Sequence, residues 1–77
     1  MEPANTRRKG KIKFMNIKSG YGFIHDIDTH EEFYFSISDI QLKEQDMQHI
    51  NDIILTFELL TVKRGPKAVR IEVLNQQ

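Results

Sequence analysis

The sequence predicts an all-β fold, a small antiparallel barrel of five strands, on three observations. Five short segments alternate polar with apolar residues or are rich in β-branched and aromatic residues. No segment keeps a helical period, and a longer polar connection follows the third predicted strand. Closing the sheet would remove the exposed edges that endanger small sheets. The 77 residues make one small domain, and a domain of this size buries only about 60% of its unfolded surface.

The first two predicted strands form a hairpin. Residues 10–16 (GKIKFMN) alternate closely enough for a strand, and residues 16–20 (NIKSG) contain turn-forming residues. Residues 21–25 (YGFIH) make the second strand. Because side chains i and i+2 of a strand share one face, Tyr21 and Phe23 lie side by side, and the glycine between them leaves the opposite face bare.

The third predicted strand covers residues 32–37 (EFYFSI), after a turn at residues 26–30 (DIDTH). Its alternation puts Phe33 and Phe35 on one face and Tyr34 on the other. A third ring can therefore join the two rings of the hairpin. Exposed rings flanked by lysines suit an unpaired nucleic-acid strand, since the rings stack on bases and the cations face phosphates.

The second half of the chain supplies two more strands. Residues 41–52 predict a polar connection with a short helical turn, and residues 53–62 (IILTFELLTV) predict the fourth strand. Residues 63–66 (KRGP) are a strong turn signal, and residues 67–74 alternate as the fifth strand. The predicted interior consists of Ile12, Ile24, Phe33, Phe35, Ile40, Leu55, Phe57, Leu59, Val69, Ile71 and Val73.

The formal net charge is zero, whereas nucleic-acid-binding domains are often strongly basic. The signs are unevenly distributed, because both ends of the chain are mainly basic and the middle is mainly acidic. If the fold brings the first and last strands together, it separates the signs and gives one face that attracts phosphate.

Residues 1–8 are predicted to form a flexible basic arm, residues 9–74 the folded domain and residues 75–77 a frayed tail. The absence of cysteine rules out disulfides and thiolate metal sites and fits a reducing cytoplasm. No apolar run approaches the roughly 18 residues needed to cross a bilayer, and the N-terminus lacks the apolar core of a signal peptide. We therefore expect a cytoplasmic protein without a membrane partner.

Metal and catalytic sites are not expected. The three histidines, His25, His30 and His49, match no established zinc spacing, although Asp26 and Asp28 are close by in sequence. No local signature supplies a nucleophile, a base and an oxyanion hole together. The sequence thus predicts a protein that is not an enzyme and has no cofactor and no small-molecule substrate.

Five stretches of the chain carry a family resemblance. Residues 10–16 (GKIKFMN) followed by residues 20–24 (GYGFI) match the pattern G-x-V-K-W-F-N and then G-[FY]-G-F-I. Residues 33–40 (FYFSISDI) match V-F-V-H-F-S-x-I, residues 55–58 (LTFE) match V-S-F-x, and residues 64–68 (RGPKA) contain G-P-x-A. These are the motifs of the cold shock domain family, which the chain resembles in order and at near-family spacing over about residues 10–73.

The resemblance implies a five-stranded barrel of the oligonucleotide-binding (OB) type, which binds single-stranded RNA or DNA and acts as an RNA chaperone. By position it implies that the binding face consists of Lys13, Phe14, Tyr21, Phe23 and Tyr34, with Arg64 at its edge. To these we add Ser36, within the second motif, and three lysines able to counter phosphate charge, Lys18, Lys63 and Lys67.

Several positions depart from the family motifs. Phe14 stands where the family has Trp, Met15 where it has Phe, Ser36 where it has His and Ile37 where it has Phe. Each change removes or shrinks a ring on which a base could stack. The sequence therefore predicts weakened or altered affinity.

Three alternatives stay open at this point. The rings of the second and third strands could belong to the core. Simple alternation puts Phe14 inside with Ile12, whereas the resemblance puts it outside, which requires a bulge or a twist in the first strand. Gly20 and Gly22 serve either a tight turn and a curved strand, which we favour, or the close approach of a nucleic-acid backbone.

The alternative function is protein–protein interaction or weak homodimerisation through the same kind of barrel, with reduced nucleic-acid binding. Met15, Ile17 and Ile37 would then supply an apolar patch. Salt separates the two functions, because phosphate binding weakens steeply as salt rises and an apolar interface does not.

Overall fold

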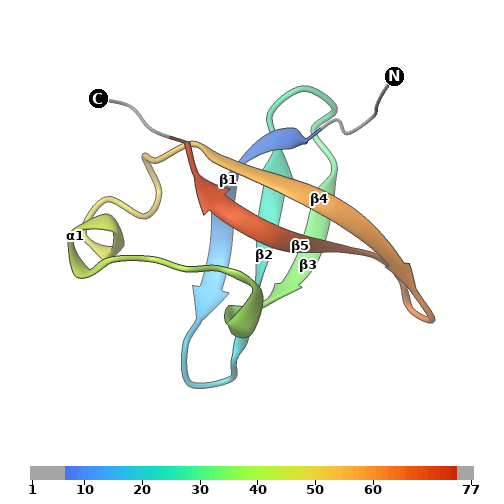
Figure 1. Cartoon of the computed structure of the whole chain (residues 1–77), viewed down its shortest axis with the longest axis horizontal. Helices are drawn as coiled ribbons and strands as arrows, with labels where there is room; N and C mark the ends of the chain where they lie inside the picture. The colour runs from blue at the N-terminus through green and yellow to red at the C-terminus, as the bar shows by residue number, and fades with distance from the viewer. Residues whose placement is uncertain (1–6, 75–77) are drawn as a thin grey trace.

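The chain forms five strands and two short helical segments, in a computed structural model that describes residues 7–74 (Figure 1). Their bounds are β1 Arg8–Asn16, β2 Tyr21–Asp26, β3 Glu32–Ser36, the 3-10 helix η1 Ile37–Asp39, α1 Glu44–Met47, β4 Leu55–Val62 and β5 Gly65–Val73. The strands close into one barrel in the order β1-β2-β3-β5-β4. The predicted all-β barrel and its five strands are confirmed, and α1 lies in the connection where a helical turn was expected.

The barrel closes through β1 and β4, so the first and last strands do not pair. β1 pairs antiparallel with β4, where Arg8 faces Phe57, and β5 lies between β3 and β4. The pairing of β3 with β5 is parallel and joins Tyr34 to Lys67. The barrel is therefore antiparallel except at this one short contact among the described strands.

β1 begins at Arg8, earlier than the predicted start at residue 10. Arg7 and Arg8, which we assigned to a flexible basic arm, both hold acidic partners: Arg7 lies 3.0 Å from Glu58, and Arg8 lies 2.9 Å from Asp26. These contacts tie the start of β1 to the barrel. The rest of the predicted arm, residues 1–6, and the predicted tail, residues 75–77, lie outside the described residues.

The condition for a separation of charge, a pairing of the first and last strands, is not met, and the signs are mixed. Basic residues from both ends of the chain pair with carboxylates from its middle, because β1 and β5 each lie beside strands or turns that carry acidic residues. The ion pairs are Arg7–Glu58, Arg8–Asp26, Arg8–Glu31, Lys13–Glu32, Lys67–Asp39 and Arg70–Glu58. The described surface therefore mixes the two signs, and these ion pairs engage three of its arginines and two of its lysines.

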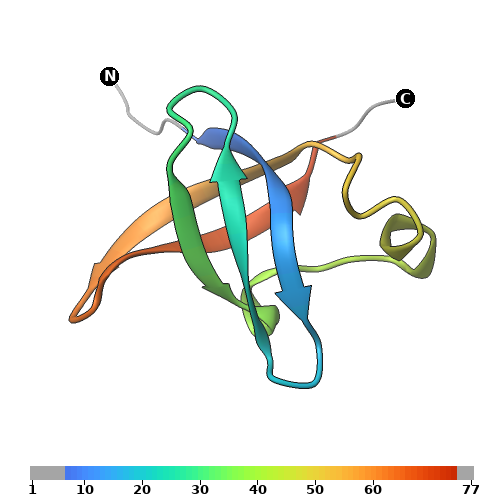
Figure 2. The same ribbon diagram turned by 180° about the vertical axis from the view of Figure 1, so that it is seen from behind.

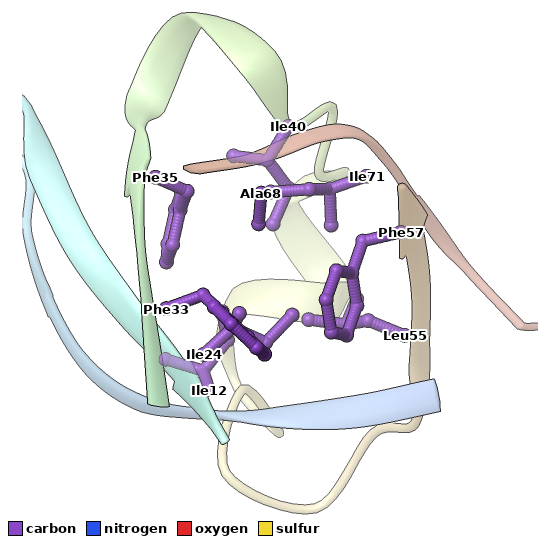
Figure 3. Close-up of a cluster of buried hydrophobic side chains, with 9 residues drawn as sticks. All are labelled: Ile12, Ile24, Phe33, Phe35, Ile40, Leu55, Phe57, Ala68 and Ile71. Carbon is purple, nitrogen blue, oxygen red and sulfur yellow. The ribbon is translucent and has the colours of Figure 1, made fainter. Parts of the chain in front are cut away.

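The core fills the barrel with side chains that point toward one another (Figure 3). Its buried members are Ile12, Ile24, Phe33, Phe35, Ile40, Leu55, Phe57, Ala68 and Ile71. All but Ala68 were predicted. Full burial of a large apolar side chain, such as that of Ile, Leu or Phe, contributes about 1.5–3 kcal/mol to the stability of the fold.

The prediction fails for Leu59, Val69 and Val73, which are only partly buried. The reason in β5 is a bulge, since Phe57 of β4 faces two residues of β5 where Arg70 adopts a φ of 51°. One extra residue reverses the alternation of a strand. Ala68 therefore points inward in place of Val69.

Candidate functional site

Four aromatic rings gather on the outer face of β1, β2 and β3, the sheet that lies in front of β4 and β5 in Figure 2. The ring centroid of Tyr21 lies 5.9 Å from those of Phe14 and Tyr34, and Phe23 lies 6.4 Å from Phe14 and 6.3 Å from Tyr34. We call Phe14, Tyr21, Phe23 and Tyr34 the ring cluster. Phe14 is 43% exposed and Tyr34 41% exposed, so the cluster offers ring surface to solvent.

The ring cluster follows from the register of β2 and β3. Residues of β2 alternate between half-buried and buried, so that Tyr21 and Phe23 face outward while Gly22 and Ile24 face inward. Phe23 pairs with Tyr34 across the two strands, and this pairing brings the two rings together. The alternative that these rings belong to the core is therefore excluded.

Phe14 joins the cluster through a bulge in β1. Ile12 pairs with Ile24 and Phe14 pairs with Phe23, so Lys13 is an extra residue between two paired positions. The bulge turns Phe14 outward although Ile12 points into the core. The orientation implied by the family motif is confirmed, and the one given by simple alternation is wrong.

Gly22 allows β1 and β3 to pack closely beneath the ring cluster. A side chain at this position would collide with the backbone carbonyl of Phe14 and would lie 2.8 Å from the ring of Phe35. Gly20 has a φ of 82° in the turn before β2, where its N–H donates to the Asn16 carbonyl at 2.9 Å. The turn thus accounts for Gly20, and the close packing of neighbouring strands accounts for Gly22.

The predicted cations divide into two groups. The Lys13 ammonium lies 2.6 Å from the Glu32 carboxylate, and the Lys67 ammonium lies 3.3 Å from that of Asp39. Three others, Lys18, Lys63 and Arg64, are exposed and have no carboxylate partner within residues 7–74.

The positions of the predicted polar residues follow the strand order. Lys67 sits beside Tyr34 through the parallel contact of β3 and β5. Lys63 and Arg64 occupy the turn of the β4–β5 hairpin, which projects beyond β3 (Figure 2). Lys18 lies in the turn between β1 and β2. The Ser36 hydroxyl lies 3.0 Å from the Ser38 hydroxyl. Because serine has no ring, Ser36 does not extend the ring cluster.

A buried carboxylate organises the turn between β2 and β3. Asp26, expected in an exposed turn, is the last residue of β2 and is only 2% exposed. Its Oδ1 accepts the N–H groups of Asp28 at 2.8 Å and Thr29 at 3.1 Å, and its Oδ2 accepts from Arg8 at 2.9 Å. Burial alone would raise the pKa of Asp26, but the hydrogen bonds from Thr29, Arg8 and Asp28 outweigh it and lower that pKa.

His25 is a residue of this face that the sequence did not single out as a binding residue. It is half-buried and follows Tyr21 and Phe23 in the outward series of β2. The same i, i+2 spacing that selected the two rings could have selected His25.

Within residues 7–74, no group of three or more His, Cys, Asp and Glu residues could hold a metal ion. No helix in this part of the chain is long and apolar enough to span a membrane.

Comparison with protein-family models identifies a family for this chain. The family model described as the 'Cold-shock' DNA-binding domain matches residues 8–74, which include every strand of the barrel and all four members of the ring cluster. A search of curated proteins finds no match to the chain.

Proposed function

The chain belongs to the cold-shock DNA-binding domain family, and from this we propose that it binds single-stranded RNA or DNA by stacking bases on the ring cluster. Membership of this family implies nucleic-acid binding. The observation that carries the more specific proposal is the meeting of four rings on one outer face, with Phe14 and Tyr34 well exposed. Every nucleobase has a π-face, so such a surface accepts unpaired bases with little regard to sequence.

The proposed activity is that of an RNA chaperone. A base stacked on Phe14 or Tyr34 is not available for pairing, so binding competes with base pairing and favours melted strands without ATP. Lys18, Lys63 and Arg64 can counter phosphate charge without first giving up a carboxylate partner. Lys13 and Lys67 can do so once a phosphate replaces their carboxylates.

The affinity is proposed to be lower than that of a family member with the full motifs. Ser36 and Ile37 stand where the family has His and Phe; Ser36 bonds to Ser38, and Ile37 packs partly against the core. Since one stacked base contributes about 1–3 kcal/mol, two lost rings weaken binding by roughly 2–4 kcal/mol, or on the order of 30-fold to 1000-fold. Titration of a labelled oligopyrimidine at low salt measures this, and saturation at nanomolar strand contradicts it.

Protein interaction or homodimerisation, the alternative function, has less support. It needs an exposed apolar patch built from Met15, Ile17 and Ile37. Met15 and Ile37 pack partly against the core, and of the three only Ile17 is strongly exposed, at 62%. Sedimentation of the free protein tests this alternative directly, since a dimer would show an increased mass.

The decisive test of the nucleic-acid proposal is the double variant Tyr21→Ala/Phe23→Ala. Both side chains lie outside the core, so the fold should persist while oligonucleotide binding weakens by at least about 30-fold. Leu60→Ala is the matched control, because it removes an exposed apolar side chain from β4, outside the ring cluster. Unchanged affinity in the double variant, with the fold verified by NMR, contradicts the proposal.

A further inference from the structure

The outer face of β2 continues beyond the ring cluster with a pair of imidazole rings. His25 lies two positions after Phe23 and, like Phe23, is half-buried on the outer face. Its ring centroid is 5.6 Å from that of His30, and the two ring planes meet at 52°. This spacing resembles those within the ring cluster, where centroids are 5.9–6.4 Å apart. The face therefore carries further planar rings toward the β2–β3 turn.

The backbone holds His30 in place. His30 adopts a φ of 67°, a left-handed conformation in which histidine, asparagine and aspartate are the commonest residues besides glycine, and its N–H donates to the Asp26 carbonyl at 2.9 Å. The buried Asp26 carboxylate also accepts two N–H groups of the same turn and pairs with Arg8. The turn is thus built on a fixed anchor, and His30 is presented to His25 from it.

The charges around the histidine pair leave a positive balance on the β1 side. His25 pairs in register with Lys11 of β1 and with Glu32 of β3. Glu32 is engaged by Lys13. Lys11 is exposed and has no carboxylate partner in the described part of the chain.

Lys9, the preceding outward residue of β1, and the carboxylates of the β2–β3 turn leave the same positive balance of charge. Lys9 is exposed and has no carboxylate partner within residues 7–74 either. Glu31 is engaged by Arg8 and by the Thr29 hydroxyl. The exposed Asp28 is the carboxylate that remains, against two lysines.

We propose that the nucleic-acid strand runs past Phe23 onto the histidine pair, where His25 and His30 take an additional base and Lys9 and Lys11 face its phosphates. This extension rests on the proposed function, since it prolongs the same face by one position. The chemistry is that of the ring cluster, a planar aromatic group for the base and a neighbouring cation for the phosphate. The occupied face is then longer than the four rings alone.

The test compares two oligothymidines, one of about four nucleotides, which the ring cluster can accommodate, and one of about eight, which can reach the turn. The double variant His25→Thr/His30→Asn removes both rings; Thr suits a strand and Asn tolerates a positive φ. It is expected to weaken binding of the longer strand by about 5-fold to 10-fold and to leave the shorter one unchanged. His49→Ala, which removes an exposed histidine after α1, is the control.

A single variant, His25→Tyr, keeps the test informative if the double variant unfolds. A larger ring at the same position should tighten binding of the longer strand. If wild type binds both strands and neither variant alters affinity for the longer one, the extension is refuted while the proposed function stands. If wild type binds neither strand, the proposed function fails and the extension falls with it.

Discussion

The salt dependence of binding follows from the ion pairs of the structure. Of the five cations predicted to face phosphate, Lys18, Lys63 and Arg64 are without a carboxylate partner among residues 7–74, whereas Lys13 and Lys67 are paired. A free cation that meets phosphate releases a counterion, and a paired one exchanges a carboxylate for a phosphate with little net release. For single strands, log K falls by about 0.7 per cation for each unit of log salt concentration.

Three contributing cations give a slope of about −2, and five would give about −3.5. Between about 50 and 200 mM salt, affinity should therefore fall roughly 20-fold rather than roughly 130-fold. The variant Glu32→Gln frees Lys13 and should steepen the slope by about 0.7 and tighten binding at low salt. Fluorescence anisotropy of a labelled oligothymidine of about four nucleotides, too short to reach Lys9 and Lys11, measures each slope when titrated at several salt concentrations.

Two results would refute this reasoning. A wild-type slope near −3.5 would mean that the carboxylate partners do not limit Lys13 and Lys67. A slope near zero would mean that phosphates are not bound, and it would favour an apolar protein interface instead. Glu44→Gln is the control for the variant, since Glu44 begins α1 and forms no ion pair with a described residue.

Two further predictions concern stability and affinity. Asp26→Asn should lower the free energy of unfolding by about 1.5–3 kcal/mol, because it breaks the contact with Arg8 at a buried site. The pKa of Asp26 is lowered in the folded state, so the stability that its carboxylate contributes is present at neutral pH and is lost as the pH falls below about 4. Thermal melts should therefore show the wild type and the variant converging in acid. A difference that stays constant with pH would contradict this. Phe14→Trp, which restores the family residue at an exposed position, should tighten oligonucleotide binding about 3-fold to 10-fold by anisotropy, and unchanged affinity would mean that this ring does not stack on a base.

Alternation predicted much of the fold and, together with the family motifs, the central part of the candidate site. The outward placement of Tyr21, Phe23 and Tyr34 follows from the period of two. The alternate residues, Gly22 and Ile24 of β2 and Phe33 and Phe35 of β3, face the inside of the barrel. These predictions needed no knowledge of distant contacts. They hold wherever a strand keeps its regular pleat.

The two bulges explain where alternation fails. An extra residue at Lys13 turns Phe14 outward, and the positive φ of Arg70 turns Ala68 inward. Neither bulge has a glycine to mark it in the sequence, and each depends on how one strand fits its neighbour across the barrel. For Phe14 the family motif carried information that local pattern did not.

The ion pairs could not be predicted from the sequence, for a different reason. Lys13 and Glu32 are far apart in the chain and belong to strands that both flank β2, so their contact exists only once the three strands are in register. Counting charges along the chain treats every lysine as free. The barrel instead engages two lysines and three arginines in ion pairs, and that is why a segregated basic face did not form.

The loss of a basic face shifts the proposed recognition from charge to stacking. A binding surface on which carboxylates engage Lys13 and Lys67 gains less affinity from phosphates at physiological salt, where charges beyond about 8 Å are largely screened. Its affinity must then come from rings, and the ring cluster has Phe14 in place of a larger Trp. Discrimination between paired and unpaired strands should accordingly be strong, since a duplex offers phosphates without free base faces. A duplex of the same length is thus expected to bind far more weakly than the single strand, and comparable affinities would show that phosphates, not bases, are recognised.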